Sequence, residues 1–486
     1  MDIQNIIEIC NPLHVSNKNI EGDFSTFALD SREVQDGSVF IAIRGTQVDG
    51  HMFLEDAIDR GCKVIICEES FYTDKDVCII EVENTQKLAG PLAQAFAGNP
   101  ADDMKVIGIT GTNGKTTTAT LVYQILTACD KKASLLGTVH KRILDDVLES
   151  KLTTSDPIEL ANDMKRMAEA GTDFLVMEVS SHALHQHRTE GIDFKIAAFT
   201  NLSQDHLDYH ETLEEYASAK KMLFDGLSES AHAVINSDDS QAAYMVQDCK
   251  AETTLLSFNE ESSYILNNSP EGITLVIEGQ RIESPLIGTF NAYNVGEAFL
   301  ICKLLGLNSQ EIANALKNAK GAAGRMETIH VEHADLPKVI IDYAHTPDAL
   351  SNVLSTLVSV KEPEQQLTVV FGAGGDRDTG KRPKMAQAAA AFADKIVVTS
   401  DNPRAENPDL IIADILDGFE KLDNVKSITE RKKAIETVIS EASNTEIILI
   451  AGKGHENYQE VNGQRHPFDD RKIAREFLNQ KAKGGN

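Results

Sequence analysis

The run from Thr110 to Thr117 contains the residue types that hold the phosphates of a nucleotide. It reads Thr-Gly-Thr-Asn-Gly-Lys-Thr-Thr and follows an apolar run of the kind that forms a buried strand. Glycines let backbone N–H groups approach phosphate oxygens, Lys115 supplies a positive charge, and Thr116 offers a hydroxyl to Mg²⁺. Ile109 stands where the common phosphate-loop pattern has its first glycine. The order of strand, glycine loop, Gly-Lys-Thr and helix still favours an ATP site over an incidental glycine turn.

Other polar side chains could serve metal or phosphate chemistry near this loop. Mg²⁺ prefers hard oxygen ligands, so Glu178, at the end of the next apolar run, is a candidate, and His206 is a less usual one. The three histidines of 180–188 would allow a zinc site, but that segment lacks cysteine partners and HExxH spacing, which favours a polar loop or substrate surface. From spacing alone, Lys220 is interpreted as an ordinary solvated helix lysine.

Four apolar runs in the C-terminal third of the chain end in polar or glycine-rich loops. These loops are DYAHTPD, GAGGDRD, SDNPRAENP and AGKGHE. In open α/β sheets, ligands bind outside the carboxyl ends of the strands. The four loops therefore predict one shared binding site.

Several domains must position these residues, because 486 residues are too many for one compact core. Alternating strand-type runs and helical stretches predict an α/β protein with largely parallel sheets. We expect a small N-terminal α/β domain (1–100), a central P-loop ATPase domain with a parallel sheet (101–327), and a C-terminal Rossmann-like domain (328–486). The run Gly98-Asn99-Pro100 is a plausible linker between the first two domains.

Composition and charge exclude several classes of partner. The chain is 42% hydrophobic and 25% charged, as is usual for globular proteins, and its formal net charge is −29. That charge argues against binding to nucleic acid or to an anionic membrane surface. Seven cysteines without a C-x-x-C motif suit a reducing compartment, and we find neither a signal peptide nor a membrane-spanning run. We expect a cytoplasmic monomer.

Several rare strings, in one order along nearly the whole chain, resemble those of the Mur ligase family of peptidoglycan synthesis. They are TGTNGKTTT (110–118), MEVSSHAL (177–184), TNLSQDHLDYH (200–210), FNAYNVGEA (290–298), GRME (324–327), DYAHTPD, GGDRD, DNPR and GKGHE. The last four are most similar to those of the branch that adds diaminopimelate. The resemblance implies that ATP and Mg²⁺ activate the D-Glu side-chain carboxylate of UDP-MurNAc-L-Ala-D-Glu as an acyl phosphate. The amine of meso-2,6-diaminopimelate would then attack it, which yields an amide, ADP and phosphate.

The resemblance also implies roles for single residues. The ATP-binding set comprises Gly111, Thr112, Asn113, Gly114, Lys115, Thr116, Thr117, Asn291, Asn294, Arg325 and Asp342. The metal ligands would be Thr116, Glu178 and His206. The catalytic residues would be Lys115, His206 and Lys220, with Lys220 carbamylated to N6-carboxylysine. Carbamylation converts an ammonium that repels Mg²⁺ into an anion. The UDP-linked substrate would contact Ser31, Thr153, Thr154, Ser180, Gln186 and Arg188.

The acceptor site implied by the resemblance distinguishes diaminopimelate from lysine. Its residues would be Arg377, Asp401, Asn402, Arg404, Gly452 and Glu456. Diaminopimelate is lysine with an extra carboxylate at its far end, and an arginine fork such as that of Arg404 suits bidentate carboxylate binding. Glu456 would take the ammonium. The alternatives are the same reaction with L-lysine, a folylpolyglutamate synthetase-like ligase, and a P-loop switch ATPase that transfers nothing to a substrate.

Overall fold

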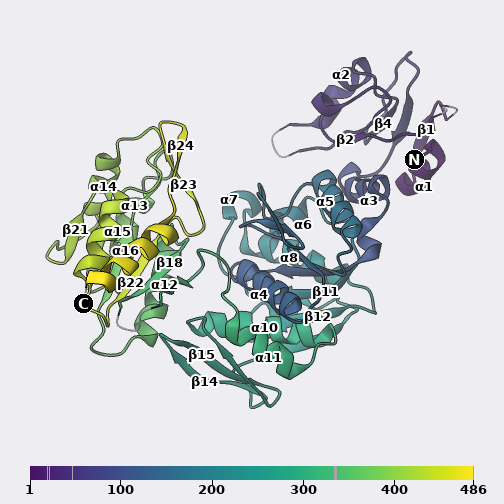
Figure 1. Ribbon diagram of the computed structural model, residues 1–486. Helices are drawn as coiled ribbons and strands as arrows, with labels where there is room; N and C mark the ends of the chain where they lie inside the picture. Colours follow the sequence, from purple (N-terminus) through teal and green to yellow (C-terminus); the bar gives the residue numbers. More distant parts are fainter. Residues whose placement is uncertain (19, 21, 46–47, 333–335, 485–486) are drawn as a thin grey trace. The chain divides into compact units, whose positions relative to one another are not determined.

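The computed structural model describes residues 1–18, 20, 22–45, 48–332 and 336–484 (Figure 1). The chain divides into two compact units, one formed by Met1–Ser257 and Gly296–Ile312 and the other by Phe258–Val295 and Ala313–Asn486. In the described part of the chain, no helix has both the length and the apolar character needed to cross a membrane.

The first sheet of unit 1 is small and mostly parallel. Its strand order is β1-β5-β4-β3-β2, and only β1 runs antiparallel to its neighbour. Its elements are α1 (Ile3–Cys10), β1 (His14–Ser16), β2 (Phe27–Ala28), β3 (Val39–Ile41), α2 (Leu54–Asp59), β4 (Val64–Cys67), β5 (Cys78–Glu81) and α3 (Thr85–Ala97), with 3-10 turns η1 (Ser31–Glu33), η2 (Gly50–Phe53) and η3 (Pro100–Asp103).

The second sheet of unit 1 has eight strands in the order β13-β12-β11-β6-β10-β7-β8-β9. The pairs from β13 to β7 are parallel, and β8 and β9 add an antiparallel edge. The strands are β6 (Lys105–Thr110), β7 (Ala133–Leu136), β8 (Lys141–Ile143), β9 (Asp146–Leu148), β10 (Phe174–Glu178), β11 (Phe194–Phe199), β12 (His232–Asn236) and β13 (Glu252–Leu256). The helices are α4 (Lys115–Ala128), α5 (Pro157–Glu169), α6 (Ser181–His185), α7 (Leu207–His210), α8 (Leu213–Asp225) and α9 (Ala242–Met245).

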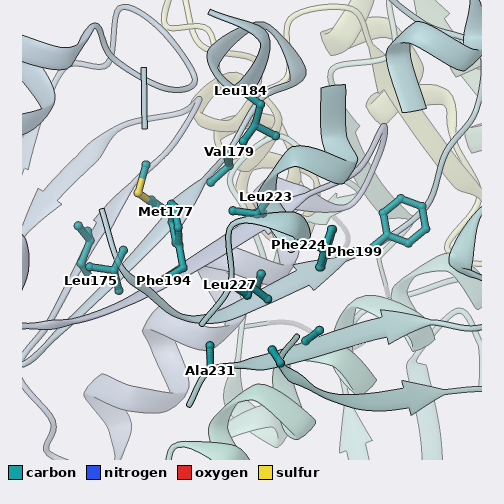
Figure 2. Close-up of a cluster of buried hydrophobic side chains, with 14 of the residues drawn as sticks. Leu175, Met177, Val179, Leu184, Phe194, Phe199, Leu223, Phe224, Leu227 and Ala231 are labelled. Atoms are coloured by element: carbon teal, nitrogen blue, oxygen red, sulfur yellow. The ribbon is translucent and has the colours of Figure 1, made fainter. Parts of the chain in front are cut away.

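One face of this sheet is packed against α6 and α8. Leu175, Met177 and Val179 alternate along β10 and its end, and they join Leu184 of α6 and Leu223 of α8 in one buried cluster (Figure 2). Each such side chain contributes about 1.5–3 kcal/mol when it is buried. Because side chains alternate along a strand, this packing directs Glu178 to the opposite face, where α4 begins.

Unit 2 contains a small antiparallel sheet and a larger one of six strands. The small sheet comprises β14 (Ser263–Ser269), β15 (Gly272–Ile277) and β16 (Gln280–Ser284). The large sheet has the order β17-β18-β22-β19-β20-β21 and is parallel except for β17. Its strands are β17 (Glu327–Thr328), β18 (Lys338–Asp342), β19 (Leu367–Phe371), β20 (Lys395–Val398), β21 (Val425–Ser427) and β22 (Ile447–Ala451).

Both faces of the six-stranded sheet are covered. Ile340 of β18 joins one apolar cluster, whereas its neighbours Val339 and Ile341 join another, as expected for a strand buried on both sides. The helices are α12 (Pro347–Val360), α13 (Lys381–Ala390), α14 (Pro408–Leu416), α15 (Arg431–Glu441) and α16 (Asp470–Gly484), and a hairpin follows β22 as β23 (Tyr458–Val461) and β24 (Gln464–Pro467). Residues of both units belong to α10 (Thr289–Leu304) and α11 (Ser309–Asn318).

The α/β fold class with parallel-rich sheets is confirmed. The apolar runs singled out in the sequence form β6, β10, β18, β19, β20 and β22. The expected domain boundaries near residues 100 and 327 stay predictions.

Candidate functional site

The phosphate loop connects the centre of the eight-stranded sheet to the start of α4. Ile109 is buried inside β6, so the loop begins only at Gly111, which explains the departure from the common pattern. Gly111 has φ 147°, and a Cβ there would lie 1.9 Å from Thr200 Oγ1. Lys115 is the first residue of α4, and its Nζ donates to Gly111 O and Thr112 O, each at 2.8 Å. The loop is therefore presented at a helix N-terminus, which favours anions.

Glu178 and Thr116, two of the three expected metal ligands, lie side by side. Glu178 is 1% exposed, and its Oε2 accepts a hydrogen bond from Thr116 Oγ1 at 2.7 Å. Its Oε1 accepts from the backbone N–H of Thr138 at 2.7 Å. A carboxylate and a hydroxyl at the start of a phosphate-loop helix are donors that fit Mg²⁺. Thr138 was missed in the sequence, although a polar residue just beyond a strand end (β7) was its signal.

His206, the third expected metal ligand, belongs to a group of aromatic side chains beside the phosphate loop. Its ring lies 4.8 Å from that of His182 and 6.1 Å from that of Tyr216, whose hydroxyl donates to Thr112 Oγ1 at 3.2 Å. His210 joins the same group, and burial, with help from neighbouring histidines, lowers the pKa of His210 to about 4. Among residues 1–18, 20, 22–45, 48–332 and 336–484, no three His, Cys, Asp or Glu side chains are arranged to hold a metal ion together.

Lys220 corrects an interpretation made from the sequence. It is not a solvated helix lysine: its side chain is 1% exposed, and its Nζ donates to Gly111 O at 2.8 Å. The ammonium lies 4.3 Å from the centre of the Tyr216 ring, one turn earlier on α8. Burial lowers the pKa of Lys220 well below the usual lysine value, and the nearby Lys115 charge lowers it further. Lys220 therefore faces the phosphate loop with a weakly basic amine.

Five of the six residues expected to bind the UDP-linked substrate lie together next to Glu178. They are Thr153, Thr154, Ser180, Gln186 and Arg188, and the sixth, Ser31, lies in η1 of the N-terminal sheet. Thr154 Oγ1 donates to the backbone oxygen of Glu178 at 2.8 Å and accepts from the N–H of Ser180 at 3.1 Å. Arg188 donates to Thr154 O at 3.0 Å and, through Nε, to Gln186 Oε1 at 3.0 Å. Burial lowers the pKa of Arg188.

The four polar loops of unit 2 meet at the carboxyl ends of the parallel strands, as the sequence predicts. The N–H of Gly375 donates to Asn402 O at 2.9 Å, and the N–H of Gly452 donates to Asp342 O at 3.1 Å. Lys381, at the start of α13, donates to His345 O at 3.0 Å. Each loop thus contacts another, and together they line one site.

The expected acceptor residues lie within this site. Arg404 has φ 51°, and its guanidinium donates to Gly375 O at 2.7 Å and lies 3.5 Å from Glu460 Oε2. Asn402 Nδ2 donates to Glu456 Oε2 at 2.9 Å. Gly452 has φ 114°, and a Cβ there would lie 2.6 Å from Asp401 Oδ2. The sixth residue, Arg377, is exposed beside Gly374.

The remaining expected nucleotide contacts form two pairs within unit 2. Asp342 accepts the N–H groups of Met326 and Ala344 at 2.8 Å each, and burial raises the pKa of Asp342 against the opposing charge of Arg325. The Arg325 guanidinium lies 4.8 Å from the centre of the Tyr343 ring.

The second pair is buried on α10. Asn294 Nδ2 donates to Asn291 Oδ1 at 2.9 Å, and Asn291 Nδ2 donates to Ile287 O at 2.8 Å. The hydrogen bond between the two amides fixes how both side chains are oriented.

Comparison with known proteins gives full-length matches. Residues 24–97 match the family model for the Mur ligase family catalytic domain, residues 109–302 that for the Mur ligase middle domain, and residues 324–454 that for the Mur ligase glutamate ligase domain.

Two curated relatives are both named UDP-N-acetylmuramoyl-L-alanyl-D-glutamate–2,6-diaminopimelate ligase. The protein from Cytophaga hutchinsonii is 41% identical, over 98% of this chain and 99% of the relative. That from Phocaeicola vulgatus is 42% identical, over 94% and 95%. A solved structure of a ligase with the same name is 34% identical, with a TM-score of 0.72 and 99% coverage of both chains.

Proposed function

Because the chain belongs to the Mur ligase family, we propose that it joins meso-2,6-diaminopimelate to the D-Glu side-chain carboxylate of UDP-MurNAc-L-Ala-D-Glu at the expense of ATP. The observation that carries this choice of acceptor is Arg404, held at the shared strand-end site by Gly375 O at 2.7 Å. Two relatives of about 41% identity, similar over almost the whole chain, carry the name of that ligase. We place the reaction in the cytoplasm, where peptidoglycan precursors are made, and expect a monomeric enzyme.

The first step is phosphoryl transfer at the phosphate loop. A carboxylate oxygen of the D-Glu side chain attacks the γ-phosphorus, the bond to the β,γ-bridging oxygen breaks, and ADP leaves. Lys115 holds the phosphates, while Thr116 and Glu178, with His206, would hold Mg²⁺. When bound, the metal neutralises phosphate charge. Positioning of this kind supplies most of the acceleration in phosphoryl transfer.

Lys220 fits the proposed carbamate because its amine is buried and its pKa is lowered. Only the unprotonated amine reacts with CO₂, so the lowered pKa leaves more of Lys220 in the reactive form than an exposed lysine would have. The carbamate would place a negative charge beside Lys115, whose positive charge lowers the pKa of the unmodified Lys220 amine.

The second step is attack by the acceptor amine on the acyl carbon, after which inorganic phosphate leaves and the nitrogen loses a proton. Arg404 and Arg377 would bind the distal carboxylate of diaminopimelate, and Glu456 would take its distal ammonium. A site built to pair a carboxylate strongly rejects an analogue without one, because its buried polar groups are then left unpaired. L-lysine should therefore be a poor acceptor.

The test is phosphate release measured with each substrate omitted in turn, and with meso-diaminopimelate, L-lysine and L-ornithine compared as acceptors. We expect release only when ATP, UDP-dipeptide and meso-diaminopimelate are all present. Release that is indifferent to both other substrates would instead support a switch ATPase. Preference for L-lysine, or use of a folate substrate, would replace the proposed acceptor or substrate.

Arg404→Ala tests the acceptor assignment directly. Loss of one partner of a charge pair costs about 2–4 kcal/mol, so kcat/KM for diaminopimelate should fall by about 30- to 1,000-fold. KM for ATP should stay within about twofold of the wild-type value, because the variant removes a contact to the acceptor and none to ATP. Arg281→Ala, which removes an exposed arginine of β16, is the matched control. Full turnover of Arg404→Ala at low diaminopimelate would show that the assignment is wrong.

A further inference from the structure

Lys453 is a buried cation among the acceptor residues, and the roles assigned above do not include it. It follows Gly452 at the end of β22, and its side chain is 0% exposed. Its Nζ lies 2.8 Å from Asn402 Oδ1, 3.1 Å from Glu456 Oε2 and 3.4 Å from Asp401 Oδ1. A lysine ammonium has three N–H donors, so each can be used on a different residue of the acceptor set.

These contacts orient the polar groups that would meet the acceptor. Asn402 Oδ1 accepts from Lys453 and from the N–H of Glu460 at 3.0 Å, so the amide nitrogen turns toward Glu456 Oε2. The segment is held from the other side by Gln459, whose Nε2 donates to Asp401 O at 2.6 Å. One ammonium therefore ties the loop after β20 to the loop after β22.

Lys453 also sets the net charge of the part of the acceptor site that contains Asp401 and Glu456. Asp401 and Glu456 together carry two negative charges, and Lys453 carries one positive charge. Arg431 lies nearby, but it is bound through two hydrogen bonds by Asp470, and both side chains are 0% exposed. The net balance of one negative charge suits one ammonium. The distal end of L-lysine carries an ammonium but no carboxylate, so the charges of Arg404 and Arg377 would repel it.

We propose that Lys453 is a specificity-determining positioning residue, which orients Asn402 and Glu456 and biases the site toward an acceptor whose distal end carries both an ammonium and a carboxylate. This rests on the proposed function, because it concerns the acceptor of that ligation. Removal of the Lys453 charge makes the site more negative by one unit. That change favours a lone ammonium, as in L-lysine, and disfavours an end that includes a carboxylate.

The experiment uses full-length Lys453→Met and Lys453→Gln proteins with all substrates. Lys453→Gln removes the charge but keeps N–H donors for the local hydrogen bonds. It therefore tests the loss of charge even if Lys453→Met does not fold. We expect KM for diaminopimelate to rise about tenfold or more in both variants, with KM for ATP and UDP-dipeptide within about twofold. The ratio of kcat/KM for L-lysine to that for diaminopimelate should rise about tenfold. Lys433→Met, which removes an exposed lysine of α15 paired with Glu436, should change none of these values.

A ratio equal to that of the wild type in both variants would overturn the inference and leave the proposed function standing. Equal losses for every substrate, or failure of both variants to fold, would also overturn it, because Lys453 would then be structural only. A wild-type protein that ligates no diaminopimelate would overturn the proposed function, and this inference with it.

Discussion

The Lys220 amine is buried 2.8 Å from Gly111 O, in a place where a positive charge is costly. Because its pKa is lowered, the folded protein binds fewer protons than the unfolded chain between that lowered pKa and about 10.4. Unfolding takes up a proton in this window, so stability rises with pH there. Lys220→Met removes the effect. The unfolding free energy of the wild type relative to this variant should rise by up to about 1.4 kcal/mol per pH unit.

Urea unfolding of both proteins between pH 7 and pH 9, in buffers free of CO₂, measures this difference. Lys433→Met is again the control, because its exposed lysine has no burial cost to relieve. A difference that does not change with pH would contradict the burial argument. In the sequence, Lys220 stands among Glu and Ala residues, and its burial depends on how α8 packs against the phosphate loop. That packing joins residues more than a hundred positions apart, which spacing alone does not reveal.

In the phosphate loop, activity depends on the exact position of the backbone. Its backbone lies against the segment after β11, where the N–H of Thr112 donates to Asn201 O at 2.8 Å. A methyl group at Gly111 would lie 1.9 Å from Thr200 Oγ1, so Gly111→Ala must shift the loop. A misplacement of about 1 Å can cost about 100-fold in rate, and we expect kcat/KM for ATP to fall at least that much.

Gly279→Ala is the control for Gly111→Ala, because it imposes an unfavourable backbone conformation without a steric clash of the added methyl group. Gly279 also has positive φ, at 80°, but a Cβ there meets no atom within 4 Å. This control should lose about 1–2 kcal/mol of stability and keep its ATP kinetics. Wild-type kcat/KM for ATP in Gly111→Ala would show that the loop can adapt.

At the scale of elements, strands and their ends were the most predictable features. The apolar run before the phosphate loop became β6, and the run that ends in DYAHTPD became β18, because a strand buried on both faces has a continuous apolar signal. The meeting of the polar loops followed from parallel topology. Lys453 lay inside the string GKGHE, but its task depends on Asp401 and Asn402 in the loop after β20 as well as on Glu456 in its own loop. Only their spatial arrangement shows it.

The whole molecule carries 75 acidic and 46 basic side chains, so at least 29 negative charges lack a positive partner at pH 7, with histidines neutral. Surface ion pairs such as those of Arg44 with Asp49, Glu68 and Glu69 are weakened by salt, but each contributes only about 0–1 kcal/mol. Repulsion among the excess carboxylates opposes the compact state and is screened by the same salt. Added salt therefore lowers stability through the ion pairs and raises it through the screened repulsion.

We expect repulsion to outweigh the ion pairs, because the excess charge acts over the whole surface while the pairs are local. An increase in ionic strength from about 0.01 M to 0.15 M shortens the screening length from about 30 Å to 8 Å. Tm should therefore rise, by about 1–2 °C for each kcal/mol of repulsion relieved in a chain of 486 residues. Calorimetry in sodium chloride and in choline chloride at equal ionic strength distinguishes screening from binding of a specific cation. A fall in Tm in both salts would mean that the local ion pairs dominate.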